Sequence, residues 1–355
     1  MRGGTVTVSW VYMVLRAAEF YGVDAEVILD AVPFDRQVLA DPEGRIPFLA
    51  YLALLERAVV VTGVSDFGLQ AGTFVRPNLH LTTLLVLNGP TLHAVYERMC
   101  RLSRFHWDRS NVGIETDGKL ARLATRPPRQ RPTLGYRHFL ESRLSIWVNF
   151  GRIALGEAWV PRAITTLYEP AASREACETF FGCPVTAGGD ALEVVFDREL
   201  LDRPTQRHFP PLDDALQQLS LDMLASVRRR DGFVEETRRA IVANLTQANN
   251  LSTGARARAA GMNIRTFQRR LEYESTTYAK LLEETRVRMA CQYFTVSQMQ
   301  LSEIAWHVGY KSPAAFDHAF RRVMDNTPSA MRAAMLEKCV THLPTPAEVL
   351  ASAEV

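Results

Sequence analysis

Cysteines are scarce in this chain: five occur in 355 residues, and no two of them form a C-x-x-C pair. An odd number of cysteines without metal or redox spacing is typical of a reduced protein, so we expect a cytoplasmic chain with no disulfide framework. One question stays open, because Cys177 and Cys183 are close enough in sequence to pair or to sense an oxidant. Neither has a basic residue beside it that would lower the pKa of its thiol.

Long apolar runs are also missing. No segment reaches the ~18 uninterrupted apolar residues that a membrane helix requires. Arg16 and Glu19 interrupt the apolar start that a cleavable signal needs. We therefore expect no membrane partner.

Catalytic and metal-binding signatures are absent as well. The chain has no H-E-x-x-H, G-x-S-x-G or G-x-G-x-x-G motif and no phosphate-binding P-loop. The histidines at positions 80, 93, 106 and 138 are too widely spaced for a metal signature. These absences predict no catalytic residue, no metal and no cofactor. Enzyme activity in the N-terminal part is kept as an alternative.

Charge is nearly balanced overall but unevenly distributed. The net charge is +2, yet residues 233–336 carry 14 Lys and Arg against 9 Asp and Glu, a balance of +5. The remainder of the chain carries 27 against 30, a balance of −3. Positive charge is thus concentrated near the C-terminus, as expected if that part alone contacts phosphates.

The first 201 residues mix helical and strand periodicities, which predicts an α+β domain. Residues 104–127 alternate like two strands around a turn at Asp117-Gly118, a predicted hairpin. Short strands are expected within 158–168 and 191–200. Helices are expected within 8–22, 24–32, 47–63, 89–105 and 135–156.

The rest of the chain divides into three segments. Residues 202–212 hold three prolines without periodicity, and 212–230 form an amphipathic pattern, so 202–232 is predicted to be a linker with a connecting helix. Residues 233–336 are predicted to be entirely helical. The last residues, 337–355, are expected to be a flexible tail.

Start and stop signals in the helical part repeat themselves. Asn263 is a good N-cap for a helix that places Ile264, Phe267 and Leu271 on one side, and Gly261 ends the helix before it. Helix, tight glycine turn and helix are the helix-turn-helix pattern.

A second unit follows the first. A helix ending at Gly309-Tyr310 precedes one that is capped by Ser312, with Pro313 in its first turn. Between the units, 277–294 form a rod of roughly 27 Å with a single apolar stripe. Two recognition helices held apart in this way can enter successive major-groove segments, which lie ~34 Å apart along one face of a duplex.

Over residues 233–336 the chain resembles the AraC/XylS family of bacterial transcription regulators. The matching pieces are AAGMNIRTFQRRL, the pair Arg286 and Ala290, EIAWHVGYKSPAAFDHAFRR and TPSAMR. The N-terminal part is similar to the arabinose-binding-type, effector-sensing domain of one branch, through YGVDAEVILDAV, GPTLHAVYERM and FFGCPVTAGGDALEVVFDRELLDRP. The resemblance implies a homodimeric DNA-binding regulator of promoter sites, with RNA polymerase as a partner if it is an activator. A ligand-independent DNA-binding protein is the alternative.

In the family, the second helix of each unit reads base edges. By position, the predicted base-reading residues are Arg265, Thr266, Gln268 and Arg269, then Ala314, Ala315, Asp317 and His318. Arginine pairs with guanine and glutamine with adenine, each contributing ~1–3 kcal/mol of discrimination. The predicted phosphate contacts are Arg270, Lys311, Ser312, Arg321 and Arg322, and the alternative for these cations is a solvated helix face.

Three departures from the family pattern affect these roles. Asp317 stands four residues before Arg321, so an intrahelical ion pair competes with a cytosine contact. Arg256 occupies a site that is normally apolar, and Gly254 weakens its helix by ~1 kcal/mol relative to alanine. Ser275 replaces a turn glycine.

An effector pocket is expected in the N-terminal domain from aromatic and basic residues, which suit an organic acid or acyl chain. The candidates are Phe105, His106, Trp107, Arg126, Tyr136, His138, Arg143 and Trp147. The alternative places the tryptophans in the core and His138 at a surface or capping position.

Overall fold

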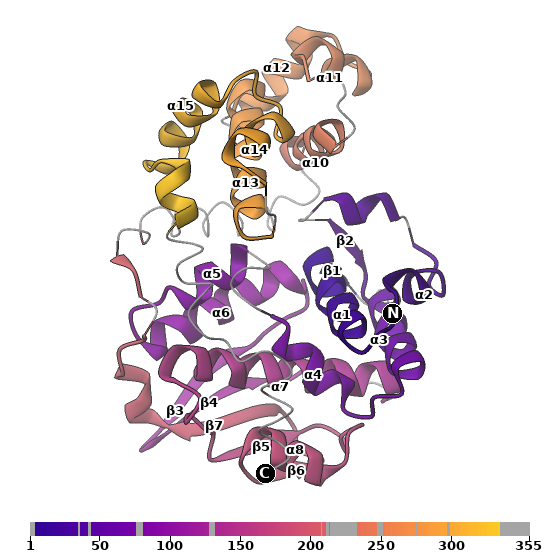
Figure 1. Cartoon of the computed structure of the whole chain (residues 1–355), viewed down its shortest axis with the longest axis vertical. Helices are drawn as coiled ribbons and strands as arrows, with labels where there is room; N and C mark the ends of the chain where they lie inside the picture. Colours follow the sequence, from indigo (N-terminus) through magenta and orange to yellow (C-terminus); the bar gives the residue numbers. More distant parts are fainter. Residues whose placement is uncertain are drawn as a thin grey trace.

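The computed structural model describes residues 4–34, 36–41, 44–75, 81–127, 132–206, 208–210, 213, 233–246, 251–274, 276–296 and 299–333. Helices and strands are interspersed in the N-terminal part, and the described segments from residue 233 onward are helical. Figure 1 shows the C-terminal helices at the end of the molecule opposite the sheet. The predicted fold class, an α+β domain followed by an all-α domain, is confirmed.

The N-terminal part is built from helices around a sheet. The strands are β1 (Thr5–Thr7), β2 (Arg45–Pro47), β3 (Gly113–Asp117), β4 (Leu120–Thr125), β5 (Ala163–Thr166), β6 (Val185–Ala187) and β7 (Leu192–Asp197). The helices are α1 (Val8–Phe20), α2 (Ala25–Leu29), α3 (Phe48–Thr62), α4 (Phe67–Thr73), α5 (Leu81–Leu87), α6 (Leu92–His106), α7 (Leu134–Leu155) and α8 (Arg174–Phe181), with 3-10 turns η1 (Arg36–Ala40) and η2 (Arg198–Asp202). The pair β1–β2 and the helices α4, α5 and α8 are additions to the sequence prediction.

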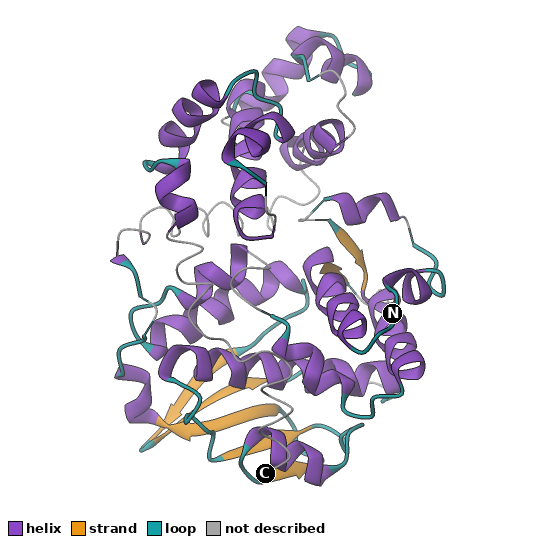
Figure 2. Ribbon diagram, in the orientation of Figure 1, coloured by secondary structure: helices purple, strands orange, loops and turns teal. Residues whose placement is uncertain are grey.

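Five strands form one sheet in the order β3-β4-β7-β5-β6. All neighbours in it are antiparallel except β5 and β6. In β7, Leu192, Val194 and Phe196 are fully buried and alternate with partly exposed residues, as a sheet with one covered face requires. Figure 2 shows α6 and α7 lying across that face of the sheet.

The predicted hairpin is present, but its first strand is shorter than expected. Asp117 pairs with Leu120 around Gly118, which has φ +57°. The expectation of strand structure from residue 104 is wrong, because α6 continues to His106. The apparent alternation comes from Phe105 and Trp107, which are both buried, but Phe105 belongs to the last turn of α6 and Trp107 is its C-cap.

The central helix α7 is buried along most of its length, and α4 packs closely against it. Added Cβ atoms at Gly68 and Gly72 would lie 2.5 Å from the His138 carbonyl oxygen and the Ser145 Cβ, so these glycines permit the close approach. The Gly68 N–H donates to His138 Nδ1 at 3.1 Å, and Ser145 Oγ donates to the Leu69 carbonyl at 2.7 Å.

No single helix within the described ranges is long and apolar enough to cross a bilayer. Only α3 and α4 taken together reach the required length and composition, and they meet at an angle of 108°. Many of their apolar residues belong to the core: Tyr51 and Leu55 of α3 and Phe67 and Leu69 of α4 are fully buried.

The C-terminal part has a small core of its own. Its helices are α10 (Phe233–Thr246), α11 (Thr253–Ala259), α12 (Ile264–Tyr273), α13 (Tyr278–Val296), α14 (Leu301–His307) and α15 (Pro313–Met324). The side chains of Phe267, Leu271, Phe294 and Phe320 are fully buried in it. Helix α13 packs against α10, α14 and α15 and so joins the two halves. The predicted connecting helix, apart from Asp213, and the predicted tail lie outside the described residues.

Candidate DNA-binding interface and effector cavity

The first helix-turn-helix unit pairs α11 with α12, and each helix begins at a capping side chain. Ser252 Oγ accepts from the Ala255 N–H at 3.3 Å, and Asn263 Oδ1 accepts from the Thr266 N–H at 2.8 Å. Between the helices, Gly261 has φ +67°, a left-handed conformation that glycine adopts without steric cost. The predicted cap at Asn263 and the turn at Gly261 are confirmed.

The second unit pairs α14 with α15 in the same way. Gly309 has φ +82° in the turn, and an added Cβ there would lie 2.9 Å from Leu245 Cδ2 of α10. Ser312 Oγ accepts from the Ala315 N–H at 3.2 Å, and Pro313 occupies the first turn. This turn is therefore both left-handed and crowded, and the predicted Ser-Pro start of α15 is confirmed.

Helix α13 contacts both units: its Tyr278 ring lies 5.7 Å from the Phe267 ring of α12, centroid to centroid. It has 19 residues, which at a rise of roughly 1.5 Å per residue give a rod of about 28 Å. Its Arg286 guanidinium lies 5.1 Å from the Tyr310 ring centroid, and burial lowers the pKa of Arg286. Glu283 forms an ion pair with Arg322 of α15. In Figure 1, α15 lies on one side of α13, and α11 and α12 lie on the other.

Burial separates an inner from an outer face on each recognition helix. Phe267 and Leu271 anchor α12, and Phe316 and Phe320 anchor α15. The eight predicted base-reading residues lie on the outer faces: Arg265, Thr266, Gln268, Arg269, Ala314, Ala315 and His318 are exposed, and Asp317 is half-buried. Both outer faces are therefore exposed to solvent.

Two residues distinguish the first unit from the sequence expectation. Ile264, predicted to lie on the same side of α12 as Phe267 and Leu271, is 49% exposed, whereas Phe267 and Leu271 are fully buried. Arg256, at the site that is normally apolar, is only 9% exposed, and its guanidinium lies 3.9 Å from Glu236 Oε1. A buried cation in so small a core costs stability unless it is paired.

Three of the predicted phosphate contacts already have partners within the protein. Arg321 Nε lies 3.0 Å from Asp317 Oδ2, so the predicted intrahelical ion pair is present. Arg322 pairs with Glu283 of α13, and the Arg270 guanidinium lies 4.3 Å from the Phe233 ring centroid. Of the other two, Lys311 is exposed and Ser312 acts as the N-cap of α15.

A cavity of about 60 Å³ lies in the N-terminal domain among α1, α5, α6 and α7. Most of its lining is apolar, with hydroxyl groups, one imidazole and one guanidinium among the exceptions. The lining residues are Trp10, Val75, Thr82, Thr83, Val86, Met99, Leu102, Ser103, His106, Ser110, Arg143, Ile146, Trp147 and Phe150.

Arg143 is the charged group of this cavity. Its side chain is 4% exposed, and it donates to Ser110 Oγ at 3.3 Å. The guanidinium carbon lies 5.3 Å from the ring centroids of Trp107 and Trp147 and 5.7 Å from that of Phe139. Burial lowers the pKa of Arg143 to about 10, so the side chain is still charged at neutral pH.

The structure brings three of the eight predicted pocket residues together at the cavity: His106, Arg143 and Trp147. Phe105, Trp107 and Tyr136 are buried in the core instead. His138 is buried and accepts from the Gly68 N–H, rather than lying at the surface. Arg126 is exposed and pairs with Glu115 at 2.8 Å.

Sequence reasoning missed the contribution of α5 to the cavity. Thr82, Thr83 and Val86 line it, and all three belong to this helix. The run LTTLLVL is seven residues long and carries no cap or charge signal, so length alone favours no element type. The spacing of Thr82, Thr83 and Val86, three and four residues apart, was the available signal.

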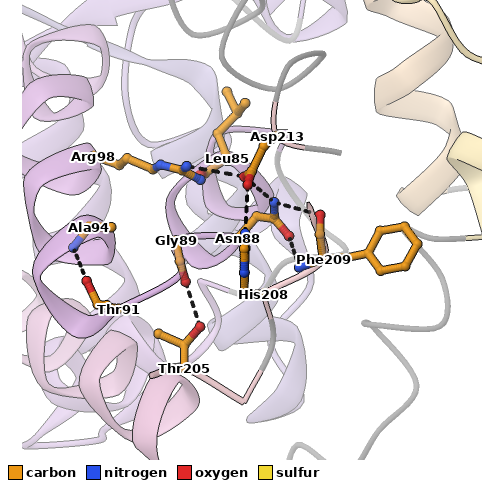
Figure 3. A network of polar contacts seen from close by, with 10 residues as sticks. All are labelled: Leu85, Asn88, Gly89, Thr91, Ala94, Arg98, Thr205, His208, Phe209 and Asp213. Carbon is orange, nitrogen blue, oxygen red and sulfur yellow. Dashed lines mark hydrogen bonds and ion pairs between the residues drawn. The ribbon is translucent and has the colours of Figure 1, made fainter. Parts of the chain in front are cut away.

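The described residues of the predicted linker are hydrogen-bonded to the N-terminal domain, as Figure 3 shows. Asn88, at the end of α5, accepts from the Phe209 N–H at 3.0 Å and donates to Asp213 Oδ1 at 3.0 Å. Arg98 of α6 donates to the same carboxylate at 3.3 Å, and His208 Nε2 lies 2.7 Å from its other oxygen. Burial raises the pKa of Asp213, but the hydrogen bonds from His208 and Arg98 outweigh this and hold the pKa below its ordinary value.

The question left open for two cysteines has a structural answer. Cys177 and Cys183 are free thiols that are 1% and 7% exposed. Burial raises the pKa of Cys177 to about 12 and that of Cys183 to about 11. Because the thiolate is the reactive form, both have the character of inert core residues.

Comparison with known proteins matches both parts of the chain. The family model described as the arabinose-binding domain of AraC transcription regulators matches residues 22–205, and a helix-turn-helix domain model matches residues 256–334. The chain is 25% identical over 332 residues to the ornithine utilization regulator of Pseudomonas aeruginosa, covering 93% of this chain and 96% of that protein. It is 23% identical over 335 residues to the transcriptional regulator VirS of Mycobacterium tuberculosis, covering 90% and 96%.

Among solved structures, the transcriptional regulator CdpR from Pseudomonas aeruginosa is similar at 22% identity and a TM-score of 0.43, with 89% of this chain and 96% of that chain covered. The two family models together cover most of the N-terminal domain and of the two helix-turn-helix units. The chain belongs to the AraC family of DNA-binding transcription regulators, with an arabinose-binding-type ligand-binding domain at its N-terminus.

Proposed function

We propose that α12 and α15 enter successive major-groove segments on one face of a promoter duplex, and that a small organic effector in the N-terminal cavity modulates this binding. The observation that carries the first half is the outward exposure of both helix faces on either side of a single 19-residue helix. A rod of about 28 Å is comparable to the ~34 Å between major-groove segments on one face of B-DNA.

The two recognition helices have unequal roles in this proposal. Arg265, Gln268 and Arg269 of α12 supply donors and acceptors that suit guanine and adenine edges, and Thr266 supplies a hydroxyl and a methyl group. Helix α15 presents Ala314 and Ala315, which suit thymine methyl groups, and His318, which suits a base acceptor. The pairing of Asp317 with Arg321 reduces its capacity to accept from cytosine. Most sequence preference therefore belongs to the α12 sub-site.

Phosphate contacts set register in the proposal. Lys311 is an exposed cation at the start of α15. Arg270 now contacts Phe233, Arg321 contacts Asp317 and Arg322 contacts Glu283. These arginines contact DNA phosphates if they give up their present contacts when the duplex binds. Such an exchange is inexpensive at an exposed pair, whose stabilisation is about 0–1 kcal/mol.

Effector modulation is supported by the two helices that lie between the cavity and the linker. Helix α5 lines the cavity with Thr82 and Val86 and is followed directly by Asn88, which accepts a hydrogen bond from the Phe209 N–H. Helix α6 lines the same cavity and carries Arg98, which holds Asp213. A ligand that shifts either helix therefore acts on the segment leading to the DNA-binding domain, which is the physical link that allostery needs.

The partners follow from this scheme. Promoter DNA is the first, a second copy of the chain is the second, and RNA polymerase is the third if the protein activates transcription. The alternative is a DNA-binding protein whose occupancy does not respond to any ligand. The cavity with a buried charge favours the ligand-responsive form, because burying an unpaired charge costs stability that a bound anion would offset.

The test is a methylation-protection and hydroxyl-radical footprint of the full-length protein on the region upstream of its own gene. Each bound protomer should protect guanines in two major-groove segments on one face, about one helical turn apart. Protection of a single segment, or of both faces of the duplex, would contradict the two-helix scheme. Repeating the footprint with a metabolite extract tests modulation separately, because only occupancy and not the protected pattern should then change.

A further inference from the structure

Arg143 is a buried cation without an anionic partner among the residues that the structure describes. Its contacts are one long hydrogen bond to a neutral hydroxyl, Ser110 Oγ at 3.3 Å, and three aromatic rings. A guanidinium has five N–H donors, so most of its hydrogen-bonding capacity is unused in this position. A charge that is 4% exposed costs stability unless it is paired, and such a cost is typical of functional sites.

The surrounding cavity indicates what the pairing group is attached to. Trp10, Val86, Ile146 and Phe150 give it apolar walls. Thr82 Oγ1 is buried in the wall and makes no hydrogen bond to any described residue. A ligand that fits these features has one anionic group for the guanidinium, an apolar body, and at most one further polar group for the threonine.

Charge balance narrows the anion to a carboxylate. A phosphate monoester carries about two negative charges near neutral pH, and the described lining offers one guanidinium, so the second charge would lack a partner. A carboxylate has one charge and two oxygens, which a guanidinium binds through two parallel hydrogen bonds. A volume of about 60 Å³ favours a short ligand over a long acyl chain.

Ligands with an ammonium group do not suit this cavity. No aspartate or glutamate belongs to its described lining. A buried ammonium would therefore have no counter-charge, and it would lie in the same cavity as a guanidinium of equal sign.

We propose that the cavity binds a short monocarboxylate with an apolar body, whose carboxylate pairs with Arg143, and that it rejects amino acids and amines. This inference rests on the proposed function, because it names the effector class of that same cavity. One relative of this chain is an ornithine utilization regulator. Ornithine has two ammonium groups, so this proposal predicts that ornithine does not bind in the cavity.

The test uses the full-length protein with butyrate, isovalerate and benzoate, each compared with its primary amide and with the amino acid or amine of similar shape. Binding is measured by calorimetry and by the rise in melting temperature, which ligand binding to the folded state produces. At least one acid should bind, and its amide and amine counterparts should bind ~10- to 100-fold more weakly, the range of a lost charged hydrogen bond. Equal affinity for acid and amide, or tighter binding of an amine, would overturn the inference.

Variants give a second, independent readout. Arg143→Met keeps the length and removes the charge, so carboxylate binding should fall ~10- to 100-fold. Arg152→Met is the matched control, because Arg152 belongs to α7 too but donates to the Phe180 carbonyl, away from the cavity lining. Its carboxylate affinity should match that of the unaltered protein. Unchanged binding in Arg143→Met would contradict the assignment. Should that variant fail to fold, the comparison of acids with amides on the unaltered protein still decides.

The footprint separates this inference from the proposed function. If a carboxylate binds through Arg143 and the footprint does not respond, the ligand class stands and effector control is wrong. Suppose that none of the acids binds, but that a compound of another class alters occupancy of the DNA site. If Val86→Trp abolishes this effect by filling the cavity, effector control stands and the ligand class is wrong. Binding of no acid by either measurement overturns the ligand class in every case.

Discussion

Replacing Arg269 with alanine tests whether α12 reads bases. Its side chain is exposed on the face opposite to the buried Phe267 and Leu271, so the substitution leaves the core of the domain intact. A bidentate arginine–guanine contact contributes about 1–3 kcal/mol of discrimination. The ratio of specific to non-specific affinity should therefore fall by about 5- to 150-fold. Affinity for random duplexes should change little.

Arg321→Ala is the contrasting substitution on α15. Arg321 is also exposed and lies beside Asp317 at 3.0 Å, and its proposed contact is a phosphate. Its loss should weaken specific and random duplexes by the same factor. The slope of log affinity against log salt should become less steep by about 0.9, the value for one phosphate contact on B-DNA.

Fluorescence anisotropy measures the specificity ratio and the salt slope. It compares a duplex that the unaltered protein selects from a random library with a scrambled duplex. Salt is varied from 50 to 200 mM, a range of about fourfold over which such slopes are resolved. Arg174→Ala is the matched control, because Arg174 forms an exposed ion pair with Glu169 in the N-terminal domain. It removes the same charge and should change neither quantity. Equal losses on both duplexes for Arg269→Ala would refute the base-reading assignment.

Three other outcomes concern turns, pH and thiols. Gly309→Ala should destabilise the C-terminal domain by about 2 kcal/mol and Gly261→Ala by about 1 kcal/mol. Both glycines have positive φ, but of the two only Gly309 has a neighbour closer than 3 Å to the added Cβ. Urea unfolding measures both free energies, and equal losses would count against the crowding argument. Because the pKa of Asp213 is lowered in the folded protein, its contribution to stability is present above the unfolded pKa and is lost as pH falls through the folded one. The hydrogen-exchange protection factor near residue 209, which compares the measured rate with the intrinsic rate at the same pH, should therefore fall on acidification, and no such change should remain in Asp213→Asn. Cys177 and Cys183 should react slowly with a maleimide at neutral pH and rapidly in urea, because burial raises the pKa of both thiols; rapid labelling of the folded protein would show that they are accessible.

The helix-turn-helix units could be predicted nearly to the residue because their signals are local. An N-cap such as Asn263 or Ser312 acts on the N–H groups of its own first turn, and a left-handed glycine such as Gly309 ends its own helix. None of these depends on a distant part of the chain. The outward faces then follow from helical periodicity around Phe267 and Phe316.

The cavity could be predicted only in part because it is assembled from segments far apart in sequence. Trp10, Thr82, His106 and Arg143 come from four different helices, and no spacing in the sequence relates them. Aromatic and basic character identified Arg143 correctly as a lining residue. The same character also marked Arg126, whose exposed pair with Glu115 has nothing to do with the cavity.

If α12 and α15 both enter the major groove as proposed, the uninterrupted course of α13 limits the DNA that this protein accepts. A single helix has no hinge, so in that scheme the protein sets the distance and rotation between the two recognition helices. One extra base pair between the two sub-sites moves the second by about 3.4 Å and rotates it by roughly 35° about the duplex axis. Natural operators for this regulator should therefore vary in base sequence far more freely than in the spacing between their two halves.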